Sequence, residues 1–247
     1  MIEGFTVIRF KACANCGNVP VTPLPTLPPC QCYNDCPDLP KHVSAAEALK
    51  LLKKGNKRYL KPKQTGEQLR CHESRRATYH YCQKPWAIVL TCADSRVSPE
   101  LIFDVGIGEL FVVRVAGNIA NACSIASIEY PVDNLDIELI VVLGHENCGA
   151  IKAALEGNSS TYNLNQLLGH LAPVAEEFGA KWRNAKGLPK KREIEYDASE
   201  DNARNVVKQL KHQSPDVLLP NNKLAIVPAV YQTGSGKVDW ERKYAWA

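Results

Sequence analysis

The sequence predicts an α/β fold with a mostly parallel central β-sheet flanked by helices and an antiparallel strand at one edge. Three short runs rich in Val and Ile, at residues 86–90, 109–115 and 137–144, lack polar alternation, which indicates strands buried on both faces. Helical patterns separate these runs, and strands that alternate with helices form parallel sheets. Residues 223–232 and 237–240, joined by Thr-Gly-Ser-Gly, predict a closing hairpin and therefore the antiparallel edge.

The first predicted helix begins after Ser44, since Glu47 stands three positions later and the two form a capping box. We expect the later helices at residues 122–136, 151–157, 163–179 and 199–213. Pro131 interrupts the first of these and should kink it. Gly157 should end the second, and Ser199, followed by acidic residues, is the expected N-cap of the last.

Residues 1–41 differ in composition from the rest of the chain. Seven prolines between positions 20 and 40 exclude a regular helix or a central strand, so we expect a Pro- and Cys-rich arm that is extended or disordered. Residues 42–247 form the predicted catalytic domain. No basic start followed by a long apolar core marks a secretory signal, so we expect a cytoplasmic protein, with an exported form as the alternative.

Composition narrows the class of protein. The 247 residues carry a formal net charge of +4, which is too small to argue for a nucleic-acid or anionic-membrane partner. The apolar runs are strand-sized and fall short of the roughly 20 residues of a membrane-spanning helix. We therefore expect a soluble globular protein with no nucleic-acid partner and no membrane span.

Chemically reactive side chains follow two of the predicted central strands. Cys92, Asp94 and Arg96 alternate after the strand at 86–90, and His145 and Cys148 follow the strand at 137–144. Ligands of parallel sheets bind beyond the carboxyl ends of the strands, where these groups should meet. Two thiolates and an imidazole favour zinc, and three protein ligands leave a fourth position for water or substrate. Each residue alone could be structural, but their coincidence at one sheet edge favours a metal site.

The motifs "CADSR" (92–96) and "GHENCGA" (144–150) resemble the paired signature of the β-class carbonic anhydrases. The resemblance extends over roughly residues 42–240. It implies one Zn²⁺ per chain bound by Cys92, His145 and Cys148, and a carboxylate–guanidinium dyad of Asp94 and Arg96. In this family Asp94 can alternatively become a fourth zinc ligand in an inactive form.

The resemblance also implies the activity and the assembly. It predicts a lyase that hydrates CO₂ reversibly to bicarbonate and a proton by attack of zinc-bound hydroxide, and that forms a homodimer or a dimer of dimers. Val89 stands where a bicarbonate-regulated subclass has tryptophan, so we expect the active form to dominate. Arg114 is expected to support the dimer or the sheet edge, and Gly149 to allow close backbone approach to the metal.

Two alternative functions remain open at this point. Relatives with the same zinc ligands hydrolyse carbonyl sulfide or carbon disulfide, and they differ mainly in access to the pocket. A zinc or redox binding module could instead use the N-terminal cysteines, which are Cys13, Cys16, Cys30, Cys32 and Cys36. We expect the histidines outside the motif to be surface or structural residues; these are His72, His80, His170 and His212.

Overall fold

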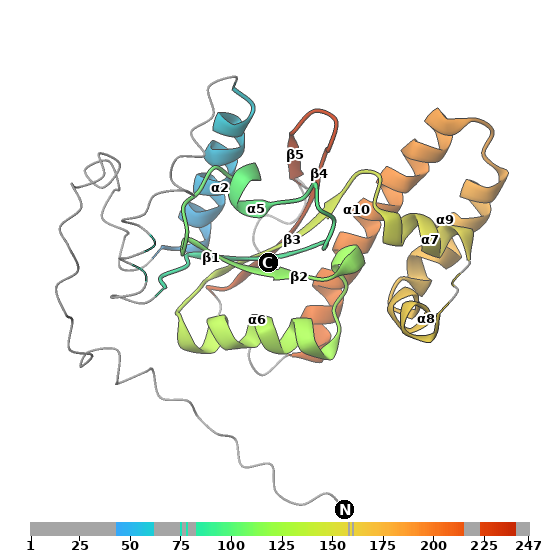
Figure 1. Cartoon of the computed structure of the whole chain (residues 1–247). Helices are drawn as coiled ribbons and strands as arrows, with labels where there is room; N and C mark the ends of the chain where they lie inside the picture. Colours follow the sequence, from blue (N-terminus) through green and yellow to red (C-terminus); the bar gives the residue numbers. More distant parts are fainter. Residues whose placement is uncertain are drawn as a thin grey trace, which may run out of the picture.

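A computed structural model describes residues 43–61, 75, 78, 83–157, 159, 161–214 and 223–240. Its centre is a five-stranded sheet in the order β2-β1-β3-β4-β5 (Figure 1). The strands are β1 (Ala87–Thr91), β2 (Leu110–Arg114), β3 (Leu139–His145), β4 (Ala225–Tyr231) and β5 (Val238–Trp240). The first four run parallel, and β5 pairs antiparallel with β4. The predicted fold class is confirmed, and each predicted strand lies within two residues of its expected bounds.

Helices cover both faces of the sheet, as Figure 1 shows for α2 (Ala45–Tyr59) and α6 (Ala122–Asn134). Side chains of a strand alternate between faces, so Val89 and Val141 pack with Leu52 of α2. Ile88 and Ile140 point to the other face, where they pack with residues of α6 and of α10 (Leu188–Gln213). Burial on both faces is the reason that β1 and β3 contain no polar alternation.

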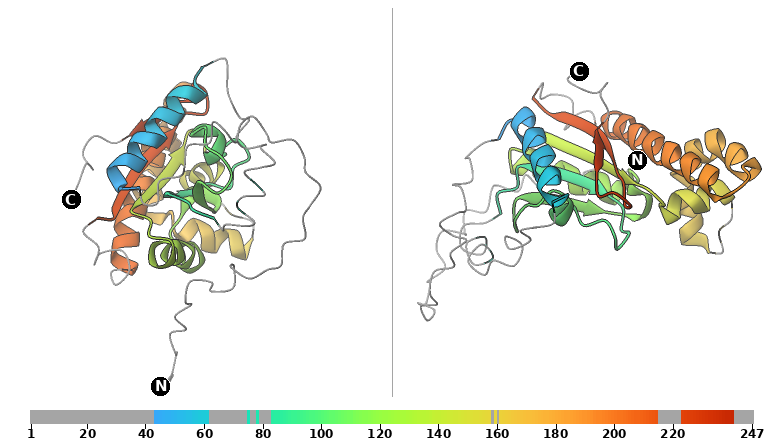
Figure 2. Two further views of the ribbon diagram at one scale, coloured as in Figure 1. Left: turned by 90° about the vertical axis from the view of Figure 1, so that its left-hand side faces the viewer. Right: turned by 90° about the horizontal axis from the view of Figure 1, so that it is seen from above.

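A lobe of helices stands beyond one end of the sheet. It consists of α7 (Gly149–Glu156), α8 (Tyr162–Gly169), α9 (Ala172–Asn184) and the first half of α10, and the right-hand view of Figure 2 shows it well apart from α2. Its apolar core includes Leu155, Val174 and Trp182 and extends to Cys92 and Cys148. The lobe therefore covers the sheet edge at which the predicted ligands lie.

The start of α2 agrees with the sequence in detail. Ser44 caps the helix, and its side chain and that of Glu47 form both bonds of the predicted capping box. Further along, Asn56 of α2 is buried, donates to the carbonyls of Ile102 and Gly236, and accepts from the Val238 N–H. The helix is thus anchored to the last residue of α5 (Pro99–Ile102) and to the β4–β5 hairpin.

Two helix predictions were wrong. The expected helix at 163–179 is divided into α8 and α9, because Pro173 in the first turn of α9 has no N–H to bond the Gly169 carbonyl and its ring would clash with that carbonyl in a continuous helix. Ser199 is not an N-cap: it lies buried inside α10, which begins eleven residues earlier, and its hydroxyl donates to the Glu195 carbonyl. Pro131 lies inside α6, which continues past it to Asn134.

The predicted arm at residues 1–41 lies outside the described residues. Among the helices that the structure does describe, none combines the length and the apolar character needed to cross a bilayer.

Candidate metal centre

Three potential metal ligands meet at the carboxyl ends of β1 and β3. These strands are parallel neighbours, with Thr91 opposite Leu143, so the segments that follow them leave the sheet at the same end. Cys92 directly follows β1, His145 is the last residue of β3, and Cys148 is the N-cap of α7. Their donor atoms all lie within 4.8 Å of one another, and all three residues are buried. The structure thus brings together the Cys–His–Cys set expected from the sequence.

The two sulfur atoms lie 3.9 Å apart. A tetrahedral zinc ion with Zn–S bonds near 2.3 Å holds two thiolates about 3.8 Å apart, so this spacing suits zinc. The hydrogen bond between the two thiols lowers the pKa of Cys92 and raises that of Cys148, which is also desolvated. The two sulfurs therefore share one proton, and the pair carries one negative charge. A metal cation bound between them would displace that proton and leave both sulfurs as thiolates.

His145 presents an unused nitrogen to this space. Its side chain is fully buried, and Nδ1 lies 2.8 Å from the Glu146 carbonyl oxygen, to which it must donate because a carbonyl cannot. Nε2 then carries the lone pair, and it has no hydrogen-bond partner among the described residues. A buried nitrogen without a partner is costly unless something else binds it. A metal ion held with the two sulfurs accounts for this lone pair, and the residues present fit zinc.

A main-chain N–H supports the Cys92 sulfur. Gly117, in the 3₁₀ turn η1 (Ala116–Asn118) after β2, lies with its N 3.3 Å from the Cys92 Sγ. Its φ of 72° suits glycine, and its carbonyl accepts from the buried Asn202 of α10 at 2.9 Å. Sequence reasoning missed both residues.

Asp94 and Arg96 form the predicted ion pair beside the three ligands. The Arg96 guanidinium donates to both carboxylate oxygens of Asp94, at 3.0 and 2.8 Å, and the Arg96 main-chain N–H adds a bond of 2.9 Å. These hydrogen bonds hold the pKa of Asp94 well below its usual range. Asp94 Oδ2 lies 4.0 Å from His145 Nε2, so an ionised carboxylate faces the metal position.

Arg96 also reaches the second motif, because it donates to the Asn147 carbonyl at 3.0 Å. Its side chain is 51% exposed, whereas that of Asp94 is 16% exposed. The pair therefore lies at the mouth of the site, with the carboxylate inward and the guanidinium toward solvent.

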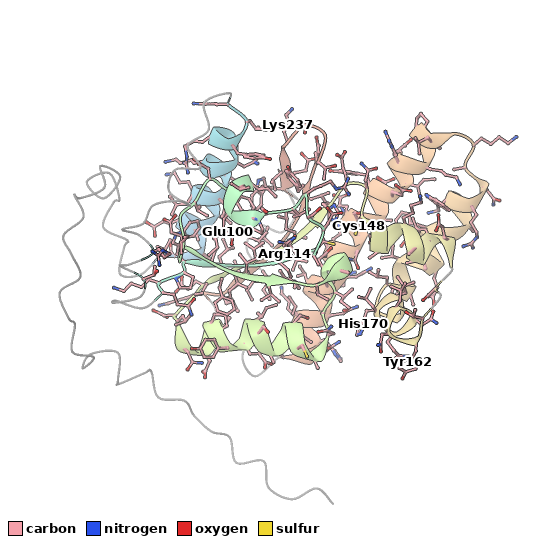
Figure 3. All side chains as sticks on the ribbon, viewed as in Figure 1. Glu100, Arg114, Cys148, Tyr162, His170 and Lys237 are labelled. Carbon is pink, nitrogen blue, oxygen red and sulfur yellow. The ribbon has the colours of Figure 1, made fainter. Side chains whose placement is uncertain are left out.

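Arg114 is the last residue of β2, which is an edge strand of the sheet, in agreement with the expected place at the sheet edge. Its guanidinium also donates to the carbonyls of Cys92 and Asp94, which the sequence did not predict. Figure 3 shows Arg114 and Cys148 near the centre of the molecule, with His170 out on the helical lobe. Gly149 is the first residue of α7, and a Cβ built there meets no protein atom within 4 Å beyond its chain neighbours, so its closeness to a metal stays a prediction.

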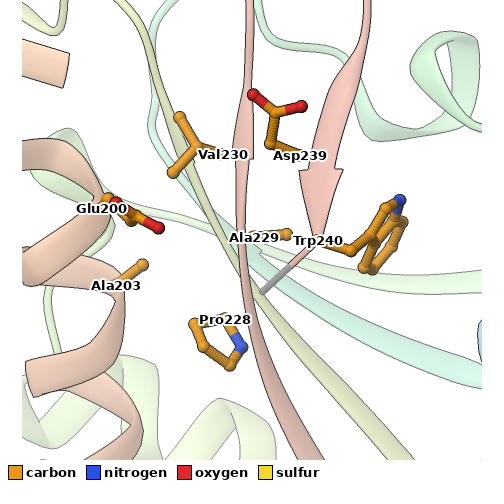
Figure 4. A pocket seen from close by; sticks show the side chains of 7 residues that line it. All are labelled: Glu200, Ala203, Pro228, Ala229, Val230, Asp239 and Trp240. Carbon is orange, nitrogen blue, oxygen red and sulfur yellow. The ribbon is translucent and has the colours of Figure 1, made fainter. Parts of the chain in front are cut away.

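Of the other histidines named from the sequence, the two that the structure describes lie away from this centre. His170 caps α8 and His212 lies near the end of α10, and both are exposed, as expected for surface residues. His72, His80 and the five N-terminal cysteines lie outside the described residues. A small cavity of about 40 Å³ lies between α10 and the β4–β5 hairpin, lined by Glu200 and Asp239 among others (Figure 4). None of the three ligand residues lines it.

Comparison with known proteins gives a consistent assignment. A family model described as carbonic anhydrase matches residues 87–238. Carbonic anhydrase 2 of Mycobacterium tuberculosis is 44% identical over 116 residues, which cover 46% of this chain and 54% of that protein, so the chain matches about half its length. Carbonic anhydrase of Mycolicibacterium smegmatis is 36% identical over 200 residues, which cover 78% of this chain and 91% of that protein. A tetrameric β-carbonic anhydrase of Sordaria macrospora shares the fold, with a TM-score of 0.61 at 22% identity, covering 72% of this chain and 89% of the other.

Proposed function

The chain belongs to the β-class carbonic anhydrase family, and from this premise and the site geometry we propose that it is a zinc-dependent lyase that reversibly hydrates CO₂ to bicarbonate and a proton. The observation that carries the proposal is the buried Cys92–His145–Cys148 group, whose unpartnered histidine nitrogen lies 4.0 Å from an ionised carboxylate.

One zinc ion per chain would be held by the two sulfurs and by His145 Nε2. Bound zinc lowers the pKa of a coordinated water toward about 7, which supplies a strong nucleophile near neutral pH. The protein keeps the ligands ready for it: Glu146 fixes the histidine tautomer, and the Gly117 N–H donates to a sulfur.

Asp94 would orient the reacting water. Its carboxylate stays ionised because Arg96 binds it through two side-chain bonds, so Oδ2 can accept a hydrogen bond from the water and leave a water lone pair free for the CO₂ carbon. Arg96 holds that carboxylate in one direction and, through the Asn147 carbonyl, ties it to the loop that carries Cys148. Orientation of this kind lowers the barrier because the geometry is fixed before the reaction.

The inactive form, with Asp94 as a fourth metal ligand, requires Asp94 to leave Arg96. Asp94 keeps that partner in this arrangement, and Val89 lies fully buried in the core where the regulated subclass has tryptophan. The active arrangement is therefore the proposed resting state. By analogy with the tetrameric relative, the proposed assembly is a homodimer or a dimer of dimers.

The test measures zinc content and CO₂ hydration on the same samples of wild type, Asp94→Asn and Arg96→Ala. We expect one zinc per chain in all three, and a fall in kcat of about 10²–10³-fold in the two variants, the size found when a group that stabilises the transition state is removed. Asp133→Asn, on the exposed face of α6, serves as the charge control and should retain wild-type turnover.

Zinc-replete Asp94→Asn with wild-type turnover would remove the dyad from the proposed mechanism. A wild-type protein that holds zinc, leaves CO₂ unhydrated and hydrolyses carbonyl sulfide would contradict the proposed substrate.

A further inference from the structure

We propose that Arg114 is a positioning residue that fixes the main chain between Cys92 and Asp94, and through it the direction of the Cys92 sulfur and of the Asp94 carboxylate. The inference rests on the proposed function, since it assigns Arg114 to the support of that same site.

The need for such support arises from the way the sheet ends. The β1–β2 pairing stops at Thr91, opposite Arg114, and the last main-chain bond beyond it joins the Val115 N–H to the Thr91 carbonyl at 3.0 Å. After this point β2 bends into the 3₁₀ turn η1, while the segment that follows β1 continues through Cys92 to Asp94. The ligand loop therefore extends past the end of its neighbouring strand.

Beyond the end of β2, the Arg114 side chain bonds the main chain of the ligand loop in place of strand pairing. Its Nε donates to the Cys92 carbonyl at 3.1 Å, and one of its terminal nitrogens donates to the Asp94 carbonyl at 2.6 Å. A guanidinium presents its N–H groups in a rigid planar fork, so two bonds to carbonyls two residues apart fix the distance between those carbonyls. Both bonds are charge-assisted and so stronger than a bond between neutral amides.

This contact complements the Asp94–Arg96 pair. Asp94 and Arg96 are two residues apart, so their mutual bonds hold the carboxylate relative to its own loop but cannot anchor that loop to the sheet. Arg96 connects the loop to the β3 side through the Asn147 carbonyl, and Arg114 connects it to β2. The loop is thus held from both neighbouring strands. If either anchor is lost, the loop can move relative to the sheet, and the bonds between Asp94 and Arg96 do not prevent that movement.

The surroundings of Arg114 argue against a role in packing. The residue is exposed, and within the described parts of the chain its guanidinium forms no salt bridge with an acidic side chain. Its removal should therefore cost little apolar burial, while it releases two carbonyls that are both next to reacting groups. A change that affects the site more than the overall stability is the mark of a positioning residue.

The decisive variant is Arg114→Met, which keeps the length of the stem and removes the donors. We expect zinc still to be bound, zinc release to a chelator to be about 10–100-fold faster, and kcat to fall by a similar factor with less change in KM. The absorption bands of the cobalt-substituted protein should shift, because they report the geometry of the metal–thiolate bonds. Thermal unfolding should stay within a few degrees of wild type.

Two further variants distinguish a positioning role of Arg114 from a general effect of its charge or of its contribution to folding. Arg114→Lys can reach one carbonyl with a point charge, so it should recover part of the loss. Arg192→Met removes an exposed arginine of α10 and should match wild type in every measurement. If Arg114→Met is too unstable to purify, Arg114→Lys carries the test, and zinc release and a cobalt spectrum equal to wild type would overturn the proposal.

The proposal is also overturned if Arg114→Met behaves as Arg192→Met does. It is overturned as well if, in both Arg114→Met and Arg114→Lys, the loss of activity is fully explained by the loss of thermal stability. These results differ from a failure of the proposed function. If the wild type does not hydrate CO₂, zinc release and the cobalt spectrum still test whether Arg114 positions Cys92.

Discussion

Gly117 places its main-chain N–H 3.3 Å from the Cys92 sulfur, and two features require glycine there. Its φ of 72° lies in the left-handed region, and a Cβ would come within 3.2 Å of Ala150 Cβ and of Leu171 Cδ1. Asn202 then secures the same peptide from α10 through the Gly117 carbonyl. The η1 turn thus links α10 to the sulfur of Cys92, a proposed metal ligand, through two hydrogen bonds of Gly117.

Asn202→Leu should disturb both the fold and the metal site. The substitution leaves the Gly117 carbonyl without its donor in a buried place, so we expect the free energy of unfolding in urea to fall by about 1–3 kcal/mol and zinc release to become faster. Asn205→Leu is the matched control on the same helix, since Asn205 bonds Asp201 and lies away from the site. Equal zinc release rates in the two variants would show that the Gly117 turn does not support the ligand.

At this scale the sequence predicted the side chains that the structure brings together at the candidate site and missed those that hold them in place. The Cys–His–Cys group and the Asp94–Arg96 pair could be found because their members follow strand ends in recognisable motifs. The contacts of Arg114, Gly117 and Asn202 join residues 20 to 85 positions apart, which no local pattern specifies.

Helix α2 shows how local and long-range determinants combine in one element. Its start follows from Ser44 and Glu47 alone, whereas its fit against the domain depends on Gly55. A Cβ at Gly55 would lie 1.7 Å from the Phe103 carbonyl oxygen, which is backbone and cannot turn away. The helix can approach the α5 loop this closely because Gly55 has no side chain.

Gly55→Ala should therefore destabilise the protein although alanine is the better helix former. We expect the free energy of unfolding in urea to fall by at least about 2 kcal/mol, since overpacking against backbone outweighs the propensity gain of about 1 kcal/mol. Gly169→Ala is the control with opposite sign: nothing lies within 4 Å of its Cβ, so it should stabilise by about 0.5–1 kcal/mol. A stabilised Gly55→Ala protein would contradict the packing described for α2.

Elements were predictable where their own residues determine them. Buried strands were found because Val and Ile without alternation can be accommodated only between two helical layers. The start of α10 was missed because Ser199 followed by Glu200 and Asp201 resembles a capped terminus, although this segment packs closely on Gly144 of β3. Tertiary packing overrode a local signal there.

For the whole molecule, metal binding and stability should be coupled. A ligand present at about 1,000 times its Kd stabilises the folded state by roughly 4 kcal/mol, so removal of zinc with a chelator should lower Tm by about 8–16 °C in a domain of this size. Differential scanning calorimetry of the holoprotein and of the chelated protein measures the shift, and added zinc should reverse it.

Cys148→Ser provides the control for the chelator itself, because a protein that has lost a ligand should bind zinc weakly and respond little. A chelator that lowers Tm equally in Cys148→Ser and in wild type would show that the shift does not come from the Cys–His–Cys centre.

The parallel order of the sheet determines when the metal site can first exist. Cys92 and Cys148 are 56 positions apart, and β3 must pair with β1 before their sulfurs meet. At synthesis rates of about 5–20 residues per second, the second thiol follows the first by roughly 3–11 s. During that interval Cys92 lacks the second sulfur of its site on the growing chain and is open to oxidants and to other thiophilic metals. Capture of the proposed zinc would therefore be a late event in the maturation of each chain, and the centre would be most vulnerable in the interval before it.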